Sequence, residues 1–169
     1  MNLNNLKNIF LNSCYSALKI INKNGSMPSG HNGSYHDNET PVRNTAHWIV
    51  SFGKAYKLTN DKRFYEAVVL ALSYLKDKKL RPSRKTFICR KKESKDKCNG
   101  LIGQAWAIEG LMAGYALTQD KAVLDLAIEV FLLHPFLEKK NMWHRVEPTG
   151  AVLTLDMTFN HQLWFAMSG

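Results

Sequence analysis

Residues 101–120 read LIGQAWAIEGLMAGYALTQD. Nearly all residues before Thr118 are apolar, whichever face of a helix is considered, which predicts a helix buried on all sides. The stretch also recurs. Its tryptophan is found again 58 residues away in each direction, and its last seven residues match a stretch 59 residues earlier. The matched positions are Trp48, Trp106 and Trp164, and residues 55–61 with residues 114–120. This period predicts a chain of helical hairpins.

Each repeat reads as a buried helix, a tight turn, an amphipathic helix and a long loop. The buried helices are predicted at residues 42–58 and 101–117, and the amphipathic helices at residues 62–77 and 121–133. Thr40 followed by Pro41 is typical of a helix start, and Asp61 can cap the next helix. Alternating buried and half-buried helices predict an all-α fold of (α/α) toroid type, with an inner and an outer layer.

The repeat also sets the expected domain organisation. We expect one partial domain over residues 1–169, with units at about 42–100, 101–159 and 160–169 after a first helix at residues 3–22. The third unit stops inside its buried helix, so about two and a half hairpins are predicted. We expect a truncated gene product, a split protein or a chosen boundary. The alternative is a subunit that a second chain completes.

The long loops are predicted to contain short β-structure. Residues 86–90 read as a short strand, and residues 141–159 read as a β-hairpin that turns at Pro148-Thr149-Gly150.

Composition excludes several classes of protein. Apolar runs are too short to cross a bilayer. Three cysteines without metal-ligand spacing predict reduced thiols in a cytoplasmic protein. No metal and no cofactor are expected. The net charge of +9 is local, because residues 76–97 hold eleven Lys/Arg and three Asp/Glu. A solvated, mobile loop is expected there, although its field could attract an anionic ligand. Nucleic-acid binding is disfavoured, because Phe87 is the only aromatic residue in this run.

Candidate catalytic residues cluster where the buried helices begin. Asp37 and Asp156 lie eleven and eight residues ahead of their repeat tryptophans, and two such carboxylates suit general acid and base chemistry on a sugar. Either aspartate could instead cap a turn or a helix. Glu109 falls inside an apolar helix, so it is a site residue or half of an ion pair. His161 is a candidate base or a buried structural histidine.

Candidate binding residues share these loops. Arg43 and Arg145 could pair with Glu109 or bind the carboxylate of an acidic sugar. Trp143 is a better candidate for stacking on a sugar ring than the repeat tryptophans, whose recurrence indicates a structural role. The remaining candidates for substrate binding are His36, Gln104 and His144.

The stretch around Trp106 also resembles a known group of proteins. Residues 102–108, with residues 115–120, are similar to the inner-helix signature of six-hairpin (α/α)6-barrel carbohydrate enzymes. The nearest are the unsaturated glucuronyl and rhamnogalacturonyl hydrolases, and the N-acylglucosamine 2-epimerases share the architecture. The resemblance implies that aspartates at loop-to-helix junctions, here Asp37 and Asp156, hydrate the double bond of an unsaturated uronic acid.

Two functions from different classes are therefore expected. The first is a fragment or half of a carbohydrate-active enzyme that resembles a glycoside hydrolase, or a sugar epimerase or lyase, and acts on an acidic oligosaccharide. The second is a non-catalytic helical-repeat module that binds a carbohydrate or a protein partner.

Overall fold

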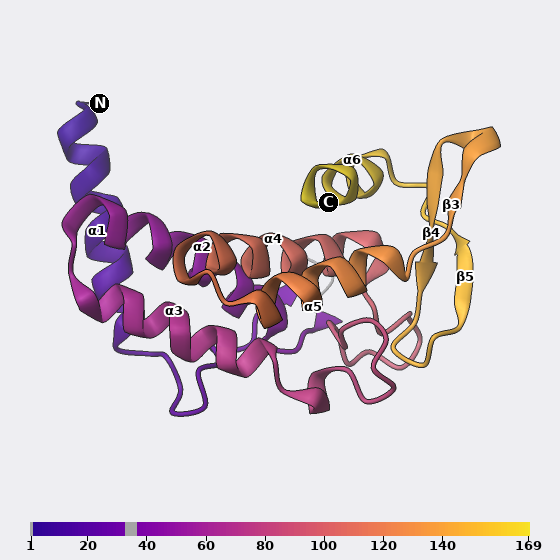
Figure 1. Cartoon of the computed structure of the whole chain (residues 1–169), viewed down its shortest axis with the longest axis horizontal. Helices are drawn as coiled ribbons and strands as arrows, with labels where there is room; N and C mark the ends of the chain where they lie inside the picture. Colours follow the sequence, from indigo (N-terminus) through magenta and orange to yellow (C-terminus); the bar gives the residue numbers. More distant parts are fainter. Residues whose placement is uncertain (1, 33–36) are drawn as a thin grey trace.

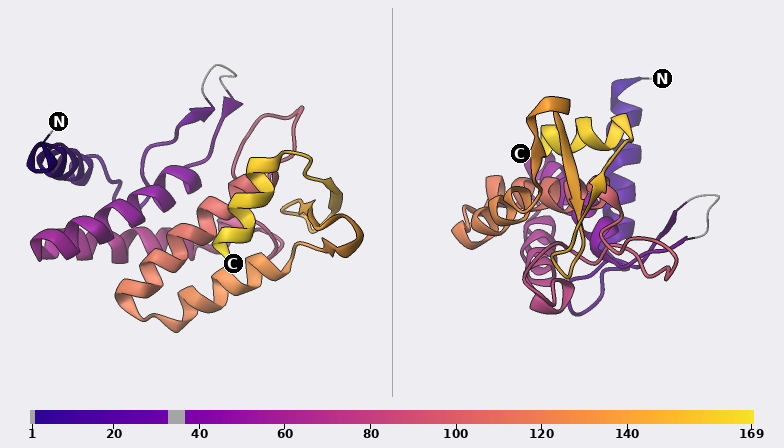
Figure 2. Two further views of the ribbon diagram at one scale, coloured as in Figure 1. Left: turned by 90° about the horizontal axis from the view of Figure 1, so that it is seen from above. Right: turned by 90° about the vertical axis from the view of Figure 1, so that its right-hand side faces the viewer.

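The computed structural model describes residues 2–32 and 37–169. The described chain is mostly helical, and α4 lies at its centre in contact with α2, α3, α5 and α6 (Figures 1 and 2). The α-helices are α1 (Leu3–Leu18), α2 (Val42–Thr59), α3 (Lys62–Leu75), α4 (Gly100–Thr118), α5 (Lys121–Leu132) and α6 (Phe159–Ser168). We call α2, α4 and α6 the repeat helices, because they carry Trp48, Trp106 and Trp164. The predicted helices of both hairpins are confirmed to within two residues, whereas α1 ends at Leu18 and not at residue 22.

The two hairpin turns are built in the same way. Asn60 after α2 and Gln119 after α4 both adopt the left-handed conformation, with φ of 55° and 56°. The aspartate that follows each of them caps the next helix: Asp61 accepts a hydrogen bond from the amide of Arg63, and Asp120 accepts one from the amide of Ala122. The predicted cap at Asp61 is confirmed, and the repeat is a structural one.

The start of α2 differs from the prediction by one residue. Pro41 occupies the N-cap position, and the Thr40 hydroxyl accepts a long hydrogen bond of 3.4 Å from the amide of Val42. The same hydroxyl donates a 2.6 Å hydrogen bond to the carbonyl of Ile88. Thr40 therefore fastens the start of the helix to the loop that follows α3.

The core forms where the repeat helices approach most closely. Gly110 of α4 faces Ala46 of α2, and a Cβ atom at this glycine would lie 2.7 Å from the Ala46 Cα. Gly114 lies in the same way against the Leu72 side chain of α3. Small residues thus allow α4 to pack tightly against two neighbours at once.

A small antiparallel sheet adds to the helices. Strands β3 (Phe136–Leu137), β4 (Met142–Val146) and β5 (Val152–Leu155) pair in the order β3-β4-β5, so the predicted hairpin is confirmed. Short strands β1 (His31–Asn32) and β2 (Asp37–Asn38) pair with each other, and 3-10 turns cover Lys78–Leu80 and Glu138–Lys140. The strand predicted at residues 86–90 is wrong. Only Arg90 forms an isolated bridge, with Glu39.

Most of the basic run is exposed, as expected for a solvated loop, but two of its arginines are not. Arg81 and Arg90 are buried, and each pairs with a carboxylate: Arg81 with Glu129 at 2.9 Å, and Arg90 with Asp96 at 2.8 Å. Part of the local charge is therefore neutralised inside the fold. In the described part of the chain, no helix is long and apolar enough to cross a membrane.

Candidate functional site

A repeated glutamine fastens the loops before α4 and α6 to the helices that follow them. The Gln104 side chain accepts a hydrogen bond from the amide of Phe87 at 2.8 Å and donates to the carbonyls of Phe87 and Cys98 at 3.0 and 2.8 Å. Gln162, 58 residues later, makes the same three hydrogen bonds with backbone groups of Trp143 and Asp156. We call this arrangement the glutamine staple. Gln104 is 0% exposed. The prediction that it binds substrate is therefore corrected: its amide is consumed by buried backbone groups.

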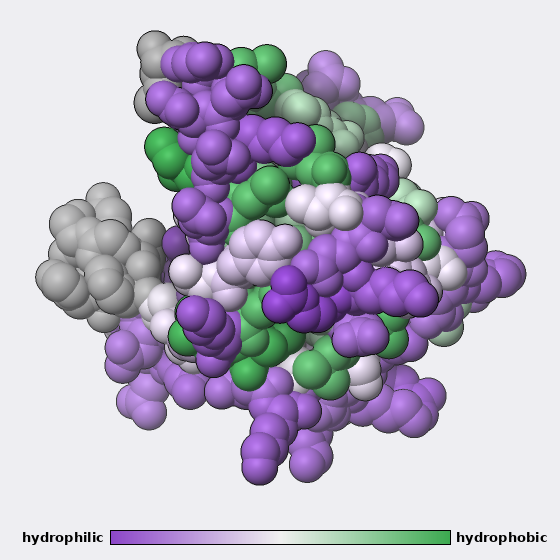
Figure 3. Space-filling view, turned by 90° about the vertical axis from the view of Figure 1, so that its left-hand side faces the viewer, coloured by the Kyte–Doolittle hydropathy of each residue, from purple (hydrophilic) through white to green (hydrophobic). Residues whose placement is uncertain are grey.

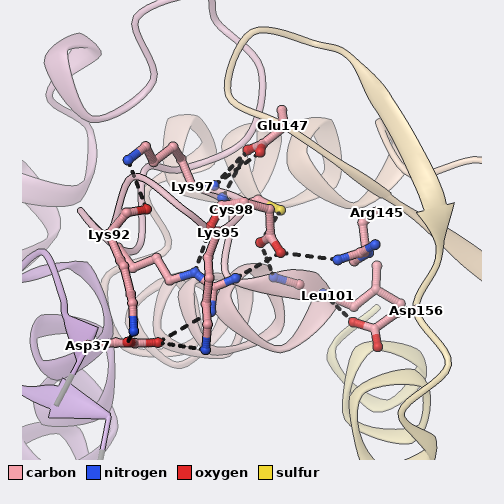
Figure 4. Close-up of polar contacts among 12 residues, drawn as sticks. Asp37, Lys92, Lys95, Lys97, Cys98, Leu101, Arg145, Glu147 and Asp156 are labelled. Carbon is pink, nitrogen blue, oxygen red and sulfur yellow. Dashed lines mark hydrogen bonds and ion pairs between the residues drawn. The ribbon is translucent and has the colours of Figure 1, made fainter. Parts of the chain in front are cut away.

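Beyond this staple, charged side chains gather around the N-terminal end of α4 (Figure 4). Asp37 is 1% exposed and lies 2.7 Å from the ammonium group of Lys92, 3.1 Å from that of Lys95 and 3.9 Å from the guanidinium of Arg90. The hydrogen bond from Lys92, aided by Lys95, lowers the pKa of Asp37 despite its burial. Asp37 is thus an ionised anchor for the basic loop.

Asp96 links this cluster to the β-sheet. Its carboxylate lies 2.8 Å from Arg90 and 3.1 Å from Arg145, and it accepts a 2.8 Å hydrogen bond from the Gly100 amide at the start of α4. Burial would raise the pKa of Asp96, but the hydrogen bonds from Gly100 and from the Cys98 thiol, together with the two arginines, lower it. The sequence prediction missed Asp96, although it lies ten residues ahead of Trp106.

Asp156 and His161 form a pair at the same helix end. Asp156 accepts hydrogen bonds from Nδ1 of His161 at 2.9 Å and from the amides of Leu101 and Thr158 at 3.0 and 3.1 Å. Burial would raise the pKa of Asp156, but these three donors outweigh it and hold the pKa at about 2. Gly100, with φ of 62°, makes the approach possible, because a Cβ there would lie 2.7 Å from the Asp156 carboxylate.

These groups surround an open cleft of about 620 Å³. Its charged and polar lining comes from three places: the basic loop, the start of α4, and the sheet with the start of α6. The lining includes Arg90, Lys95, Asp96, Asn99, Arg145, Glu147, Asp156 and His161. Three of the predicted site residues, Arg145, Asp156 and His161, are therefore brought together. Asp37 does not line the cleft, although it pairs with Lys95, which does.

Glu109 and Arg43 lie elsewhere, on a surface shared by the repeat helices. Glu109 accepts a 3.3 Å hydrogen bond from the indole of Trp164, and it lines a separate pocket of about 430 Å³ with residues of α6. Arg43 pairs with Glu39 at 2.8 Å, and its guanidinium lies 4.9 Å from the ring centre of Trp106. The expected pairing of Arg43 with Glu109 is not seen.

The remaining predicted residues have structural surroundings. The Trp143 ring packs against Phe131, Phe136 and Phe165 and is half-buried, so its role as a platform for a sugar ring stays a prediction. His144 bonds through Nδ1 to the carbonyl of Leu153 within the β-hairpin. His36 lies outside the described residues.

The cysteines and possible metal ligands add no reactive group. All three cysteines are free and buried, and burial raises the pKa of the Cys89 and Cys98 thiols. Thiols in such surroundings are poor nucleophiles. Within residues 2–32 and 37–169, no cluster of His, Cys, Asp and Glu has the arrangement of a metal site.

Comparison with known proteins gives one informative match. Over 168 residues the chain is 49% identical to archaeal glycosylation protein Q of Haloferax volcanii. The match covers 99% of this chain and 45% of the relative, so the chain spans less than half of the relative's length. No protein-family model matches the chain, and no solved structure matches it.

Proposed function

We propose that this chain is the saccharide-binding part of a glycosylation protein, and that the cleft at the start of α4 takes an acidic saccharide. The observation that carries the proposal is the His161–Asp156 pair, set in the same cleft as Arg90, Lys95 and Arg145. The name of the Haloferax relative supports a role in glycosylation. Guanidinium groups suit a uronic-acid carboxylate, because they can donate two parallel hydrogen bonds to it.

The proposed architecture is an (α/α) toroid of the kind found in the glucuronyl hydrolases and the 2-epimerases. Two features support it. The hairpin turns after α2 and α4 share one geometry, and the glutamine staple recurs at 58 residues. Successive repeat helices contact one another, while α3 and α5 pack against them.

Within this site, His161 is the group best suited to move a proton. Asp156 accepts from Nδ1, which leaves the lone pair of a neutral imidazole on Nε2, and His161 lines the cleft. An aspartate that orients a histidine in this way fixes its tautomer and stabilises the imidazolium once formed. We infer that Nε2 removes or returns a proton on the bound saccharide.

A pair of carboxylates that share the work of acid and base is less well supported. A glycosidase of that type needs one carboxyl group that stays protonated until it donates. Lys92 and Lys95 favour the ionised form of Asp37, and the pKa of Asp156 is about 2. Neither aspartate would hold a proton near neutral pH, so proton transfer by His161 is the chemistry that we propose in place of hydrolysis.

Calorimetric titration with D-glucuronate and D-glucose tests the binding. We expect glucuronate to bind about tenfold more tightly than glucose, and Arg145→Gln to remove most of that preference, because one guanidinium contact with a carboxylate contributes about 1.5 kcal/mol. Lys121→Gln is the matched control, since Lys121 is exposed on α5 and pairs with Asp125. Equal affinity for the two sugars would contradict the proposal.

Proton transfer is tested separately by NMR in heavy water. A base at Nε2 would take the proton from C5 of methyl glucuronoside, beside the carboxylate, and return a deuteron, so the H5 signal would fade. His161→Gln should stop the exchange while changing the affinity for glucuronate less than about threefold. Binding without exchange in the wild-type protein would favour the non-catalytic module.

A further inference from the structure

Successive repeat helices meet through the same face. Two side chains of α2 contact the Trp106 ring of α4. The Arg43 guanidinium lies 4.9 Å from the centre of this ring, and the centre of the His47 ring lies 5.5 Å from it. In the next repeat, α4 contacts Trp164 of α6. The indole N–H of Trp164 donates a 3.3 Å hydrogen bond to Glu109, and the ring centres of Trp106 and Trp164 are 6.4 Å apart. The α2–α4 contact is thus followed by an α4–α6 contact on the same side of the helix.

The 58-residue period shows where this face continues. Positions 43, 47 and 51 of α2 correspond to 101, 105 and 109 of α4, and to Phe159, Leu163 and Met167 of α6. In α2 and α4 these positions are partly or fully buried, with Leu101 and Ala105 at 0% exposure. In α6 the three side chains are 75%, 49% and 78% exposed.

The α6 face is apolar and forms one side of a pocket. Phe159, Leu163 and Met167 are spaced by four residues, so they lie along one side of the helix. Leu163 and Met167 line the 430 Å³ pocket together with Glu109 and Trp164. Figure 1 shows α6 at the edge of the helical part of the molecule. Exposed apolar surface of this kind marks an interaction site.

We propose that this face of α6 docks a fourth repeat helix, and that this helix belongs to a helical hairpin in the segment equivalent to the unmatched part of the Haloferax relative. The matched stretch is 45% of that relative, so more than half of its length lies outside the match. The docked helix would continue an interface that the chain already forms twice. Its contacting residue is expected to be a tryptophan or another large apolar side chain, as Trp106 and Trp164 are.

A second copy of the chain fits less well. Self-association through α6 would leave a second apolar groove uncovered, about 580 Å³ in volume, which is lined by Ile9, Ile20, Trp48 and neighbouring residues of α1. Figure 3 shows apolar residues exposed among polar ones on the side of the molecule that carries α1. A partner with further repeats would offer an apolar repeat helix to each of the two edges.

Co-production tests the proposal. The full chain, with an affinity tag, is produced together with the unmatched part of the relative. The molar mass of the purified material is then measured by light scattering. We expect a one-to-one complex. Leu163→Lys with Met167→Lys should reduce recovery of the partner at least about tenfold, because two charges would be buried in an apolar contact. Val69→Lys is the matched control, since Val69 is exposed on α3.

Three results would overturn the proposal. The partner could fail to co-purify, or stay insoluble in the presence of the wild-type chain. The double variant could retain the partner as well as Val69→Lys does. The chain could instead form a homodimer that the double variant abolishes, which would assign the α6 face to a second copy. Circular dichroism of each variant separates a lost contact from a lost fold.

Discussion

The body of α4 and the surroundings of its N-terminal end have opposite chemistry. Along its length, α4 packs through small and apolar residues, with Gly110 against Ala46 and Gln104 satisfied by backbone groups. At its N-terminal end, carboxylates and cations alternate: Asp37, Arg90, Asp96 and Arg145 follow one another at ion-pair distance. The first region determines stability through packing. In the second, Arg90, Asp96 and Arg145 line a cleft open to solvent, where they can exchange partners with a ligand.

The largest effect is expected from the packed region. Gln104→Leu would remove three hydrogen bonds to the backbone and leave buried groups of Phe87 and Cys98 unpaired, so we expect a loss of about 4 kcal/mol in the free energy of unfolding. Gln162→Leu is the matched control, because the same staple is only partly buried there. Urea unfolding measures both. An equal loss at the two positions would contradict the role assigned to burial.

A smaller effect is expected from His134, a titratable side chain inside the packed region. It is buried against Phe165, and Nδ1 lies 3.0 Å from the carbonyl of His144. Burial lowers its pKa from 6.5 to about 4. Because the folded pKa is lowered, the stability is complete above pH 6.5 and falls as the pH drops toward 4.

His134→Asn tests this. The asparagine amide can replace the Nδ1 donor but does not titrate. We expect the wild type to lose about 3 kcal/mol more than the variant between pH 7 and pH 4, measured by urea unfolding at each pH. Parallel pH profiles for the two proteins would show that His134 is already solvated in the folded state.

The cleft gives the third effect, at lower pH. The pKa of Asp156 falls from 3.8 to about 2 on folding, so its contribution is present above about pH 4 and is lost as the pH falls toward 2. Asp156→Asn should therefore reduce the free energy of unfolding at pH 7 by about 2 kcal/mol and flatten its acid dependence. Asp125→Asn, at an exposed pair on α5, is the control. No difference between the two variants would contradict the geometry of the His161–Asp156 pair.

The repeat explains why the helices could be predicted and the cleft only in part. Trp48, Trp106 and Trp164 fixed the helices because periodic apolar residues report local structure directly. Gln104 and Gln162 recur at the same 58-residue spacing, but the sequence prediction did not use this recurrence and assigned Gln104 to substrate binding. Residues that recur at the spacing of the repeat helices, such as these glutamines, have a structural role here.

The contacts of the cleft depend on pairs that are distant in sequence. Asp37 was predicted as catalytic, but Lys92, 55 residues away, holds its carboxylate. Arg145 reaches Asp96 across 49 residues. Side chains from two loops are in contact only because both loops lie at the N-terminal end of α4. No local sequence pattern predicts these contacts. His161 was found because it lies beside the start of a predicted helix.

The central claim is that an acidic saccharide binds beside His161. Its most direct test is an NMR titration of the imidazole signals of the full chain with D-glucuronate. We expect the ring signals of His161 to shift in proportion to binding, and those of the buried His134 to stay unchanged. Shifts at other histidines with His161 unmoved, or no shift at saturating glucuronate, would contradict it.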